Sequence, residues 1–150
     1  MTASMVGHYR LVRQLGAGGM GAVYEAVDTM VERRVAIKML REEIARQPDL
    51  IERFRVEAVL LAKLNHPCTA TLYNFFREGN DYFMVMEFVP GRTLEEVLRQ
   101  CGRLPVDTAV SIMRQTLDGM AHAHDGGVLH RDIPICNMWC TAISSRPTSW

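Results

Sequence analysis

The sequence lacks long apolar runs and lacks net charge, and each absence excludes a class of protein. Nowhere do about 18 apolar residues follow one another, and the N-terminus, MTASMVGHYRLVRQ, lacks the apolar run of a signal peptide. The 17 basic residues balance the 17 acidic residues, so no net field attracts a nucleic-acid backbone or an anionic membrane surface. We therefore expect no nucleic-acid partner, no membrane segment in this chain and a cytoplasmic location.

The cysteines also lack the paired CxxC spacing of a redox or zinc motif. There are four, at Cys68, Cys101, Cys136 and Cys140. Without an export signal they are expected to stay reduced. Cys136 and Cys140 could ligate a metal, but no second pair stands at zinc spacing, so ordinary thiols are the favoured interpretation.

Apolar content is sufficient for a core, since 48% of the 150 residues are hydrophobic. Alternating, β-branched segments predict five short strands before about residue 90. Gly79-Asn80-Asp81 is typical of a hairpin turn and joins the last two strands. The expected strands are residues 9–15, 22–28, 34–40, 69–78 and 81–89.

A helix is predicted between Pro48 and Pro67, because proline suits a first helical turn and also ends a helix. One stripe of this helix is apolar, and Glu57 falls within it. An unpaired buried carboxylate costs several kcal/mol. The spacing leaves open whether Glu57 has a partner or lies in water at the edge of the stripe. The apolar residues of the stripe are Phe54, Leu61 and Leu64.

The pattern changes from strand to helix at Pro90-Gly91, which predicts a two-lobed protein. Thr93 and Glu96 form a capping box that opens a short helix, and Gly102 closes it. A longer helix is expected from Pro105 to the glycines at 126 and 127. Its apolar residues fall at core spacing: Val110, Met113, Leu117, Met120 and Ala121.

Gly16, Gly18 and Gly21 form a G-x-G-x-x-G motif. Glycines at this spacing let backbone N–H groups approach phosphate oxygens, because no Cβ intervenes. A Rossmann turn shares the spacing but needs a following helix and an acidic residue about 20 positions on. Here the following segment favours strand, and the next strand ends at Lys38. The lysine favours phosphate binding over NAD.

Val23 completes G-x-G-x-x-G-x-V, Lys38 ends the sequence VAIK, and His130-Arg131-Asp132 follows later. With these motifs, residues 9–132 resemble the N-terminal half of a protein kinase domain, most closely the bacterial serine/threonine kinases of eukaryotic type. The resemblance implies an α+β fold with a five-stranded antiparallel N-lobe sheet, an αC helix and the first helices of an incomplete C-lobe. The implied segments are a tail (1–8), the N-lobe and hinge (9–89), a partial C-lobe (90–132) and an atypical tail (133–150).

The resemblance implies how ATP phosphates would be held. Gly16, Gly18 and Gly21 would lie over the phosphates, and Lys38 would contact the α- and β-phosphates. Glu57 would pair with Lys38, which would give the carboxylate of the apolar stripe a functional partner.

The resemblance also implies an adenine pocket. Val23 and Ala36 would pack on the ring. Met86 would occupy the gatekeeper position. The backbones of Glu87 and Val89 would bond to the edge of the base, so their side chains say little.

Asp132 corresponds to the catalytic base of the family, and Asn137 stands at the spacing of a Mg²⁺ ligand. ATP and Mg²⁺ are therefore the expected cofactors. The family's lysine between these two positions is replaced by Pro134, and the 150 residues contain no Asp-Phe-Gly.

Residues 133–150 differ in composition from the rest, with both tryptophans, one arginine and no acidic residue. This suggests a reading-frame shift or a truncated gene model, although the spacing of Asn137 argues against a break before it. Helices without their usual bundle would expose an apolar face. We therefore expect poor solubility or a partner that covers them.

Two main hypotheses follow. The chain is either a serine/threonine protein kinase, present as an incomplete domain inactive alone, or a nucleotide-binding pseudokinase or regulatory fragment. The protein substrate is unknown in either case. A Rossmann oxidoreductase is disfavoured because the ribose-binding acid is missing.

We expect the 150-residue chain to show no Mg-ATP-dependent phosphorylation above a Lys38→Ala control, because the Asp-Phe-Gly carboxylate and the catalytic-loop lysine are absent. The measurement is transfer of labelled γ-phosphate to a generic protein substrate and to the chain itself. A clear difference between the two proteins would contradict this prediction.

Overall fold

The computed structural model describes residues 4–18, 21–40 and 48–127. The chain divides into two compact units. The first consists of Met1–Lys63 with Thr71–Phe88, and the second of Leu64–Ala70 with Val89–Trp150. Each unit is described by itself.

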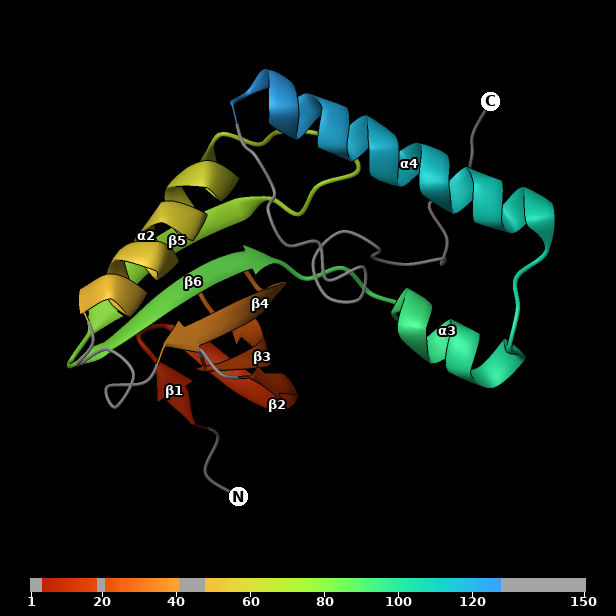
Figure 1. Cartoon of the computed structure of the whole chain (residues 1–150). Helices are drawn as coiled ribbons and strands as arrows, with labels where there is room; N and C mark the ends of the chain where they lie inside the picture. The colour runs from red at the N-terminus through yellow and green to blue at the C-terminus, as the bar shows by residue number, and fades with distance from the viewer. Residues whose placement is uncertain (1–3, 19–20, 41–47, 128–150) are drawn as a thin grey trace. The chain divides into compact units, whose positions relative to one another are not determined.

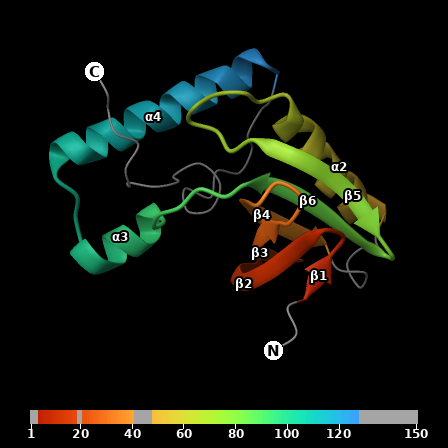
Figure 2. The same cartoon turned by 180° about the vertical axis from the view of Figure 1, so that it is seen from behind.

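One six-stranded antiparallel sheet forms most of the described first unit, in the order β1-β2-β3-β4-β6-β5 (Figure 1, Figure 2). In the residues described, the helix α2 accompanies it. The elements are β1 (Met5–Val6), β2 (Tyr9–Gly18), β3 (Gly21–Asp28), β4 (Arg33–Leu40), α2 (Pro48–Ala62), β5 (Leu72–Glu78) and β6 (Asp81–Glu87).

The first unit differs from the sequence prediction in three places. β1 is a sixth strand inside residues 1–8, where a tail was expected; its two residues are too few to show alternation. β2 continues through Gly16 to Gly18, where a turn was expected, because pairing with β3 holds these glycines extended. α2 ends at Ala62 and not at Pro67. Directly after it, the N–H of Lys63 donates to the Leu60 carbonyl, three residues back, which tightens the last turn.

One cluster of the hydrophobic core lies on one face of the sheet, while Leu40 and Met84 are fully buried on the other face. Ile37 in β4 and Val85 in β6 are cross-strand partners, and both are fully buried. Directly opposed residues of an antiparallel pair project to the same face, and alternation sends their neighbours to the other face. The buried residues of this cluster are Val6, Tyr9, Ala26, Val35, Ile37, Phe83 and Val85.

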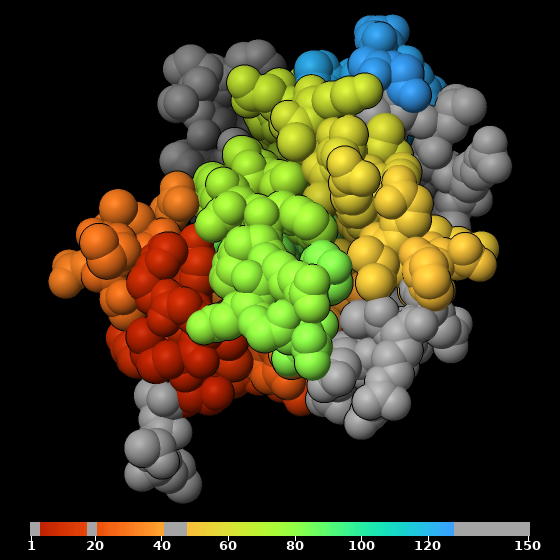
Figure 3. All heavy atoms as spheres, turned by 90° about the vertical axis from the view of Figure 1, so that its left-hand side faces the viewer, coloured from red at the N-terminus to blue at the C-terminus, as the bar shows by residue number. Residues whose placement is uncertain are grey.

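Two adjacent phenylalanines of β5 project to opposite faces of the sheet. The ring of Phe75 lies 5.8 Å from the ring of Phe54 in α2, which is 1% exposed. The ring of Phe76 instead stacks on Phe83 in the core, at 5.2 Å between centroids. α2 therefore packs on the face opposite the cluster of Ile37 and Val85, and Figure 3 shows it beside β5 at the surface.

The hairpin turn that the sequence predicted between β5 and β6 is confirmed. Glu78 pairs with Asp81, so Gly79 and Asn80 form a two-residue turn. Gly79 has φ 61, a left-handed conformation that glycine adopts without steric cost.

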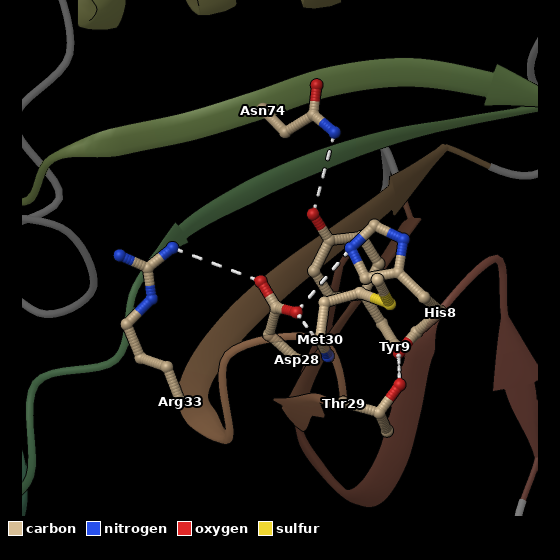
Figure 4. Close-up of polar contacts among 7 residues, drawn as sticks. All are labelled: His8, Tyr9, Asp28, Thr29, Met30, Arg33 and Asn74. Atoms are coloured by element: carbon tan, nitrogen blue, oxygen red, sulfur yellow. Dashed lines mark hydrogen bonds and ion pairs between the residues drawn. The ribbon is translucent and has the colours of Figure 1, made fainter.

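Asp28 ties the β3–β4 turn to the start of β2 (Figure 4). Its side chain is 8% exposed, and its Oδ1 accepts a hydrogen bond of 3.1 Å from the N–H of Met30. His8 Nε2 lies 3.5 Å from Oδ1, and Arg33 Nη2 lies 4.0 Å from Oδ2. Thr29 completes the connection, because its hydroxyl and its N–H both donate to the His8 carbonyl. The buried Asp28 carboxylate thus holds the β3–β4 turn against His8, the residue before β2.

The described part of the second unit contains two helices, α3 (Leu94–Cys101) and α4 (Val106–Asp125). The predicted capping box opens α3: the N–H of Glu96 donates to the Thr93 hydroxyl, and the N–H of Thr93 donates to the Glu96 carboxylate. Gly102 caps the other end, as expected.

α4 carries an exposed apolar face. Four of its residues at helical spacing are more than half exposed, although the spacing is that of a core. The exposed residues are Val106 (77%), Val110 (60%), Met113 (56%) and Leu117 (56%).

No helix in the described residues is long and apolar enough to cross a membrane.

Two histidines hold the Leu64–Ala70 segment to α4 within the second unit. The N–H of Asn65 donates to His122 Nε2 over 3.3 Å, and the rings of His66 and His122 stack at 5.1 Å. The N–H of Cys68 in turn donates to His66 Nδ1. Sequence patterns gave no signal for this contact, because the two segments are far apart along the chain.

We predict that Asp28→Ala lowers the free energy of unfolding by about 1–2 kcal/mol, because the Met30 N–H loses its buried acceptor. Urea denaturation of the 150-residue chain measures the change. Asp28→Asn is the control: it keeps an acceptor oxygen and loses only the charge, so its effect should be smaller. Equal losses from both variants would contradict the assignment to the hydrogen bond.

Candidate functional site

Strand register gathers the expected nucleotide-binding side chains on one face of the sheet. Val23 in β3 is the cross-strand partner of Lys38 in β4, and Ala36 in β4 is the partner of Met86 in β6. Opposed residues share a face, and Ala36 and Lys38 are two apart on one strand. All four therefore project to the face opposite the cluster of Ile37 and Val85. The sequence predicted the residues, and the register groups them.

The glycines of the motif have different structural roles. Gly18 pairs with Gly21 where β2 meets β3. A Cβ on Gly21 would stand 1.9 Å from the backbone oxygen of Met39, and the residue has φ +141, so the fold itself requires glycine there. A Cβ on Gly16 would meet nothing within 4 Å. Packing does not explain glycine at position 16, where the backbone is open to a ligand.

Lys38 and Glu57 form an ion pair between β4 and α2. The ammonium nitrogen lies 2.7 Å from Oε1 and 2.8 Å from Oε2 of the carboxylate. The side chains are 20% and 24% exposed, so the pair is half-buried. Glu57 thus has a partner, which answers the question that helical spacing left open. The pair fixes the lysine ammonium on the sheet face that also carries Val23, Ala36 and Met86.

A second charged cluster lies on the same face, and the sequence analysis missed it. Glu25 is the cross-strand partner of Ala36, and its side chain is 7% exposed. Arg13 Nε donates to Oε2 at 2.7 Å, and Arg34 donates to Oε1 through Nε at 3.0 Å and Nη2 at 2.6 Å. The signal was available, because strand alternation places this glutamate on the same face as Val23.

The environment of Glu25 lowers the pKa of its carboxyl. Burial alone would raise its pKa, but hydrogen bonds and charges from Arg34 and Arg13 outweigh burial and lower the pKa below the ordinary value. A lowered folded-state pKa means that the stabilisation is complete above the ordinary pKa and is lost as pH falls through the folded value. The cluster is therefore charged at neutral pH.

The end of β6 is held by its neighbours. Met86 is 8% exposed at the position expected for the gatekeeper. The N–H of Glu87 donates to the Thr71 carbonyl over 2.8 Å, and the N–H of Thr71 donates to the Glu87 carboxylate over 3.3 Å. Phe88 follows, with the guanidinium of Arg34 4.2 Å from its ring centre. The next hinge residue, Val89, belongs to the second unit.

The catalytic-loop residues lie outside the described residues. This applies to Asp132, Asn137 and the two cysteines Cys136 and Cys140. Within residues 4–18, 21–40 and 48–127, no group of three His, Cys, Asp or Glu side chains could hold a metal ion. The expected Mg²⁺ ligand therefore stays a prediction.

A curled antiparallel sheet with one helix joined to it by a lysine–glutamate pair is the architecture of a protein kinase N-lobe. The protein kinase domain family matches residues 9–144, which include the segment beyond Asp132 up to residue 144. The chain belongs to this family.

The relatives that this chain resembles in sequence are serine/threonine-protein kinases. The serine/threonine-protein kinase PknA of Mycobacterium tuberculosis is 41% identical over 143 residues, covering 92% of this chain and 33% of PknA. The serine/threonine-protein kinase PrkC of Bacillus subtilis is 42% identical over 127 residues, covering 85% of this chain and 20% of PrkC. The chain thus spans a third or less of these two relatives.

A solved structure agrees on the fold. The crystal structure of the PknI kinase domain of Mycobacterium tuberculosis is similar with a TM-score of 0.78 at 26% identity. The similarity covers 94% of this chain and 58% of that chain. The kinase-like fold expected from the motifs is confirmed, with a sixth strand added.

We predict that Gly21→Ala destabilises the fold by roughly 1–3 kcal/mol, because the new Cβ collides with the Met39 carbonyl and φ is strained. Gly16→Ala is the matched control, since its Cβ enters open space. Thermal unfolding of both variants measures the difference. A Gly16→Ala variant as unstable as Gly21→Ala would show that the two glycines are not distinguished by packing.

Proposed function

We propose that this chain is the ATP-binding part of a serine/threonine protein kinase, which transfers the γ-phosphate of ATP to a protein hydroxyl. One observation carries the proposal: the Lys38–Glu57 ion pair is formed on the sheet face that also bears Val23, Ala36 and Met86. This face combines a fixed cation with small and apolar side chains, which suits a phosphate chain attached to a flat base.

The phosphate end of the proposed site depends on Lys38. A lysine ammonium is a compact positive charge, but its long side chain is mobile unless something fixes it. Glu57 supplies that restraint through both carboxylate oxygens. The backbone at Gly16, Gly18 and Gly21 would lie over the phosphates, and the open space at Gly16 is consistent with that role.

The base end depends on apolar contacts and on backbone groups. Val23 and Ala36 would pack against the adenine ring, and the small Ala36 side chain leaves room for it. Met86 would close the inner end as gatekeeper. The backbones of Glu87 and Val89 would hydrogen-bond the edge of the base.

Catalysis would need the segment beyond residue 127. Asp132 would orient the substrate hydroxyl and accept its proton, and Asn137 would help to hold Mg²⁺. When bound, Mg²⁺ neutralises charge on the phosphate oxygens. Pro134 stands where the family has a lysine, so that position carries no positive charge.

The proposed partners are ATP, a protein substrate of unknown identity, and a protein surface that covers the apolar face of α4. That face presents Val106, Val110, Met113 and Leu117 to solvent. An exposed apolar stripe of this kind normally marks an interaction surface.

We predict that Lys38→Ala weakens Mg-ATP binding by roughly tenfold or more, because a charge-assisted contact to phosphate is worth about 1.5–3 kcal/mol. Isothermal titration calorimetry of the 150-residue chain measures the change. Lys63→Ala is the matched control: Lys63 is the only other lysine in the sequence, and it is exposed.

The Lys63→Ala control should bind Mg-ATP and unfold like the unchanged chain. Lys38→Ala leaves the half-buried Glu57 carboxylate without its partner, so its unfolding midpoint should fall, and binding is measured at a temperature at which this variant remains folded. If Lys38→Ala and Lys63→Ala bind equally well, Lys38 is not a phosphate ligand and the proposed ATP site is wrong.

A further inference from the structure

Arg34 contacts the segment that connects the sheet to the second unit. Its guanidinium carbon lies 4.2 Å from the centre of the Phe88 ring, within the range of a cation–π interaction. Phe88 is the first residue after β6 and the last residue of the first unit. The contact therefore acts at the point where the strand becomes hinge.

The guanidinium of Arg34 is fixed by Glu25. Two of its N–H groups donate to the same carboxylate oxygen, at 3.0 and 2.6 Å. Arg13 occupies the other oxygen at 2.7 Å. Because the carboxylate is buried and each of its oxygens accepts from an arginine, the Arg34 guanidinium is held with its donors on the acid while its carbon lies over the Phe88 ring.

Register places this contact at the base end of the proposed ATP site. Every second residue of β4 projects to the same face. Arg34, Ala36 and Lys38 therefore share one face. Arg34 is two residues from Ala36, the proposed adenine contact, and four from Lys38, the proposed phosphate contact. Four residues of strand span about 13 Å, so Arg34 is remote from the phosphates.

Phe88 stands in sequence between Glu87 and Val89, the two residues whose backbones are proposed to bond the adenine edge. Fixing its ring restricts the φ and ψ angles of the residue between those two peptide groups. Glu25 is thus coupled to the hinge through one arginine and one ring.

We propose that Arg34 is a positioning residue for the adenine base: held by Glu25, it packs on Phe88 and fixes the hinge backbone in the orientation that accepts the base. The inference rests on the proposed ATP binding. If the inference is right, loss of the Arg34–Phe88 contact weakens binding of the base and leaves binding of the phosphates unchanged. A general loss of stability would weaken both.

The experiment compares two ligands, Mg-ATP and Mg-tripolyphosphate, which share a phosphate chain but differ in the base. Calorimetry gives Kd for each ligand with the unchanged chain, Arg34→Met and Arg13→Met. Arg34→Met should weaken ATP binding by roughly 3- to 10-fold and leave tripolyphosphate binding unchanged. Arg13→Met is the matched control, because it removes a cation from the same carboxylate while the Arg34–Phe88 contact remains.

A second variant covers the case in which Arg34→Met fails to fold because Glu25 loses a partner. Arg34→Lys keeps a positive charge for the carboxylate but offers no flat face to the ring. It should show the same selective loss of ATP affinity. In a Phe88→Ala background, Arg34→Lys should have no further effect, because the contact it disrupts is already gone.

Equal losses for ATP and tripolyphosphate in the Arg34 variants would overturn the inference, since they would indicate a structural effect. So would an ATP-selective loss in Arg13→Met, which would assign the effect to the charge of Glu25. ATP binding by the unchanged chain that Arg34→Met and Arg34→Lys leave unaltered overturns this inference alone. No ATP binding by the unchanged chain overturns it together with the proposed function.

Discussion

The ion pair between Lys38 and Glu57 is the interaction on which the other features of the site depend. A lysine in the middle of a sheet face, flanked by apolar side chains, needs an anion nearby because partial burial penalises its charge. The nearest helix supplies that anion, with both carboxylate oxygens within 2.8 Å of the ammonium nitrogen. The pair therefore positions a cation and also connects α2 to β4 through a contact that packing alone would not specify.

The same sheet face carries a second buried carboxylate, and comparing the two pairs explains how the face is organised. Lys38 is a point charge on a flexible chain, so one glutamate fixes it. Arg34 is a planar group that can bind an acid with its edge and an aromatic ring with its face. Glu25 therefore connects to Phe88 at the end of β6. In the proposed function, one end of the face would hold the phosphates and the other the base, while the opposite face carries the cluster of Ile37 and Val85.

Several elements could be predicted because their signals are local. The two-residue turn at Gly79-Asn80, the capping box of Thr93 and Glu96, and the long helix up to Gly126 are confirmed. The errors have equally local causes. β1 is too short to alternate, and β2 keeps its glycines extended because β3 pairs with them, which composition alone does not reveal.

By itself the sequence determined the family, most of the strands and helices, and the identity of the residues expected to bind ATP, because motif spacing and periodicity are properties of neighbouring residues. Only the tertiary structure decided which of those residues share a face and that Glu25 reaches Phe88 through Arg34. It also contains the Lys38–Glu57 pair, which the family resemblance implied and helical spacing left open. These are contacts between strands and a helix far apart along the chain. Register fixes them, and register is set by the packing of the whole sheet rather than by any single segment.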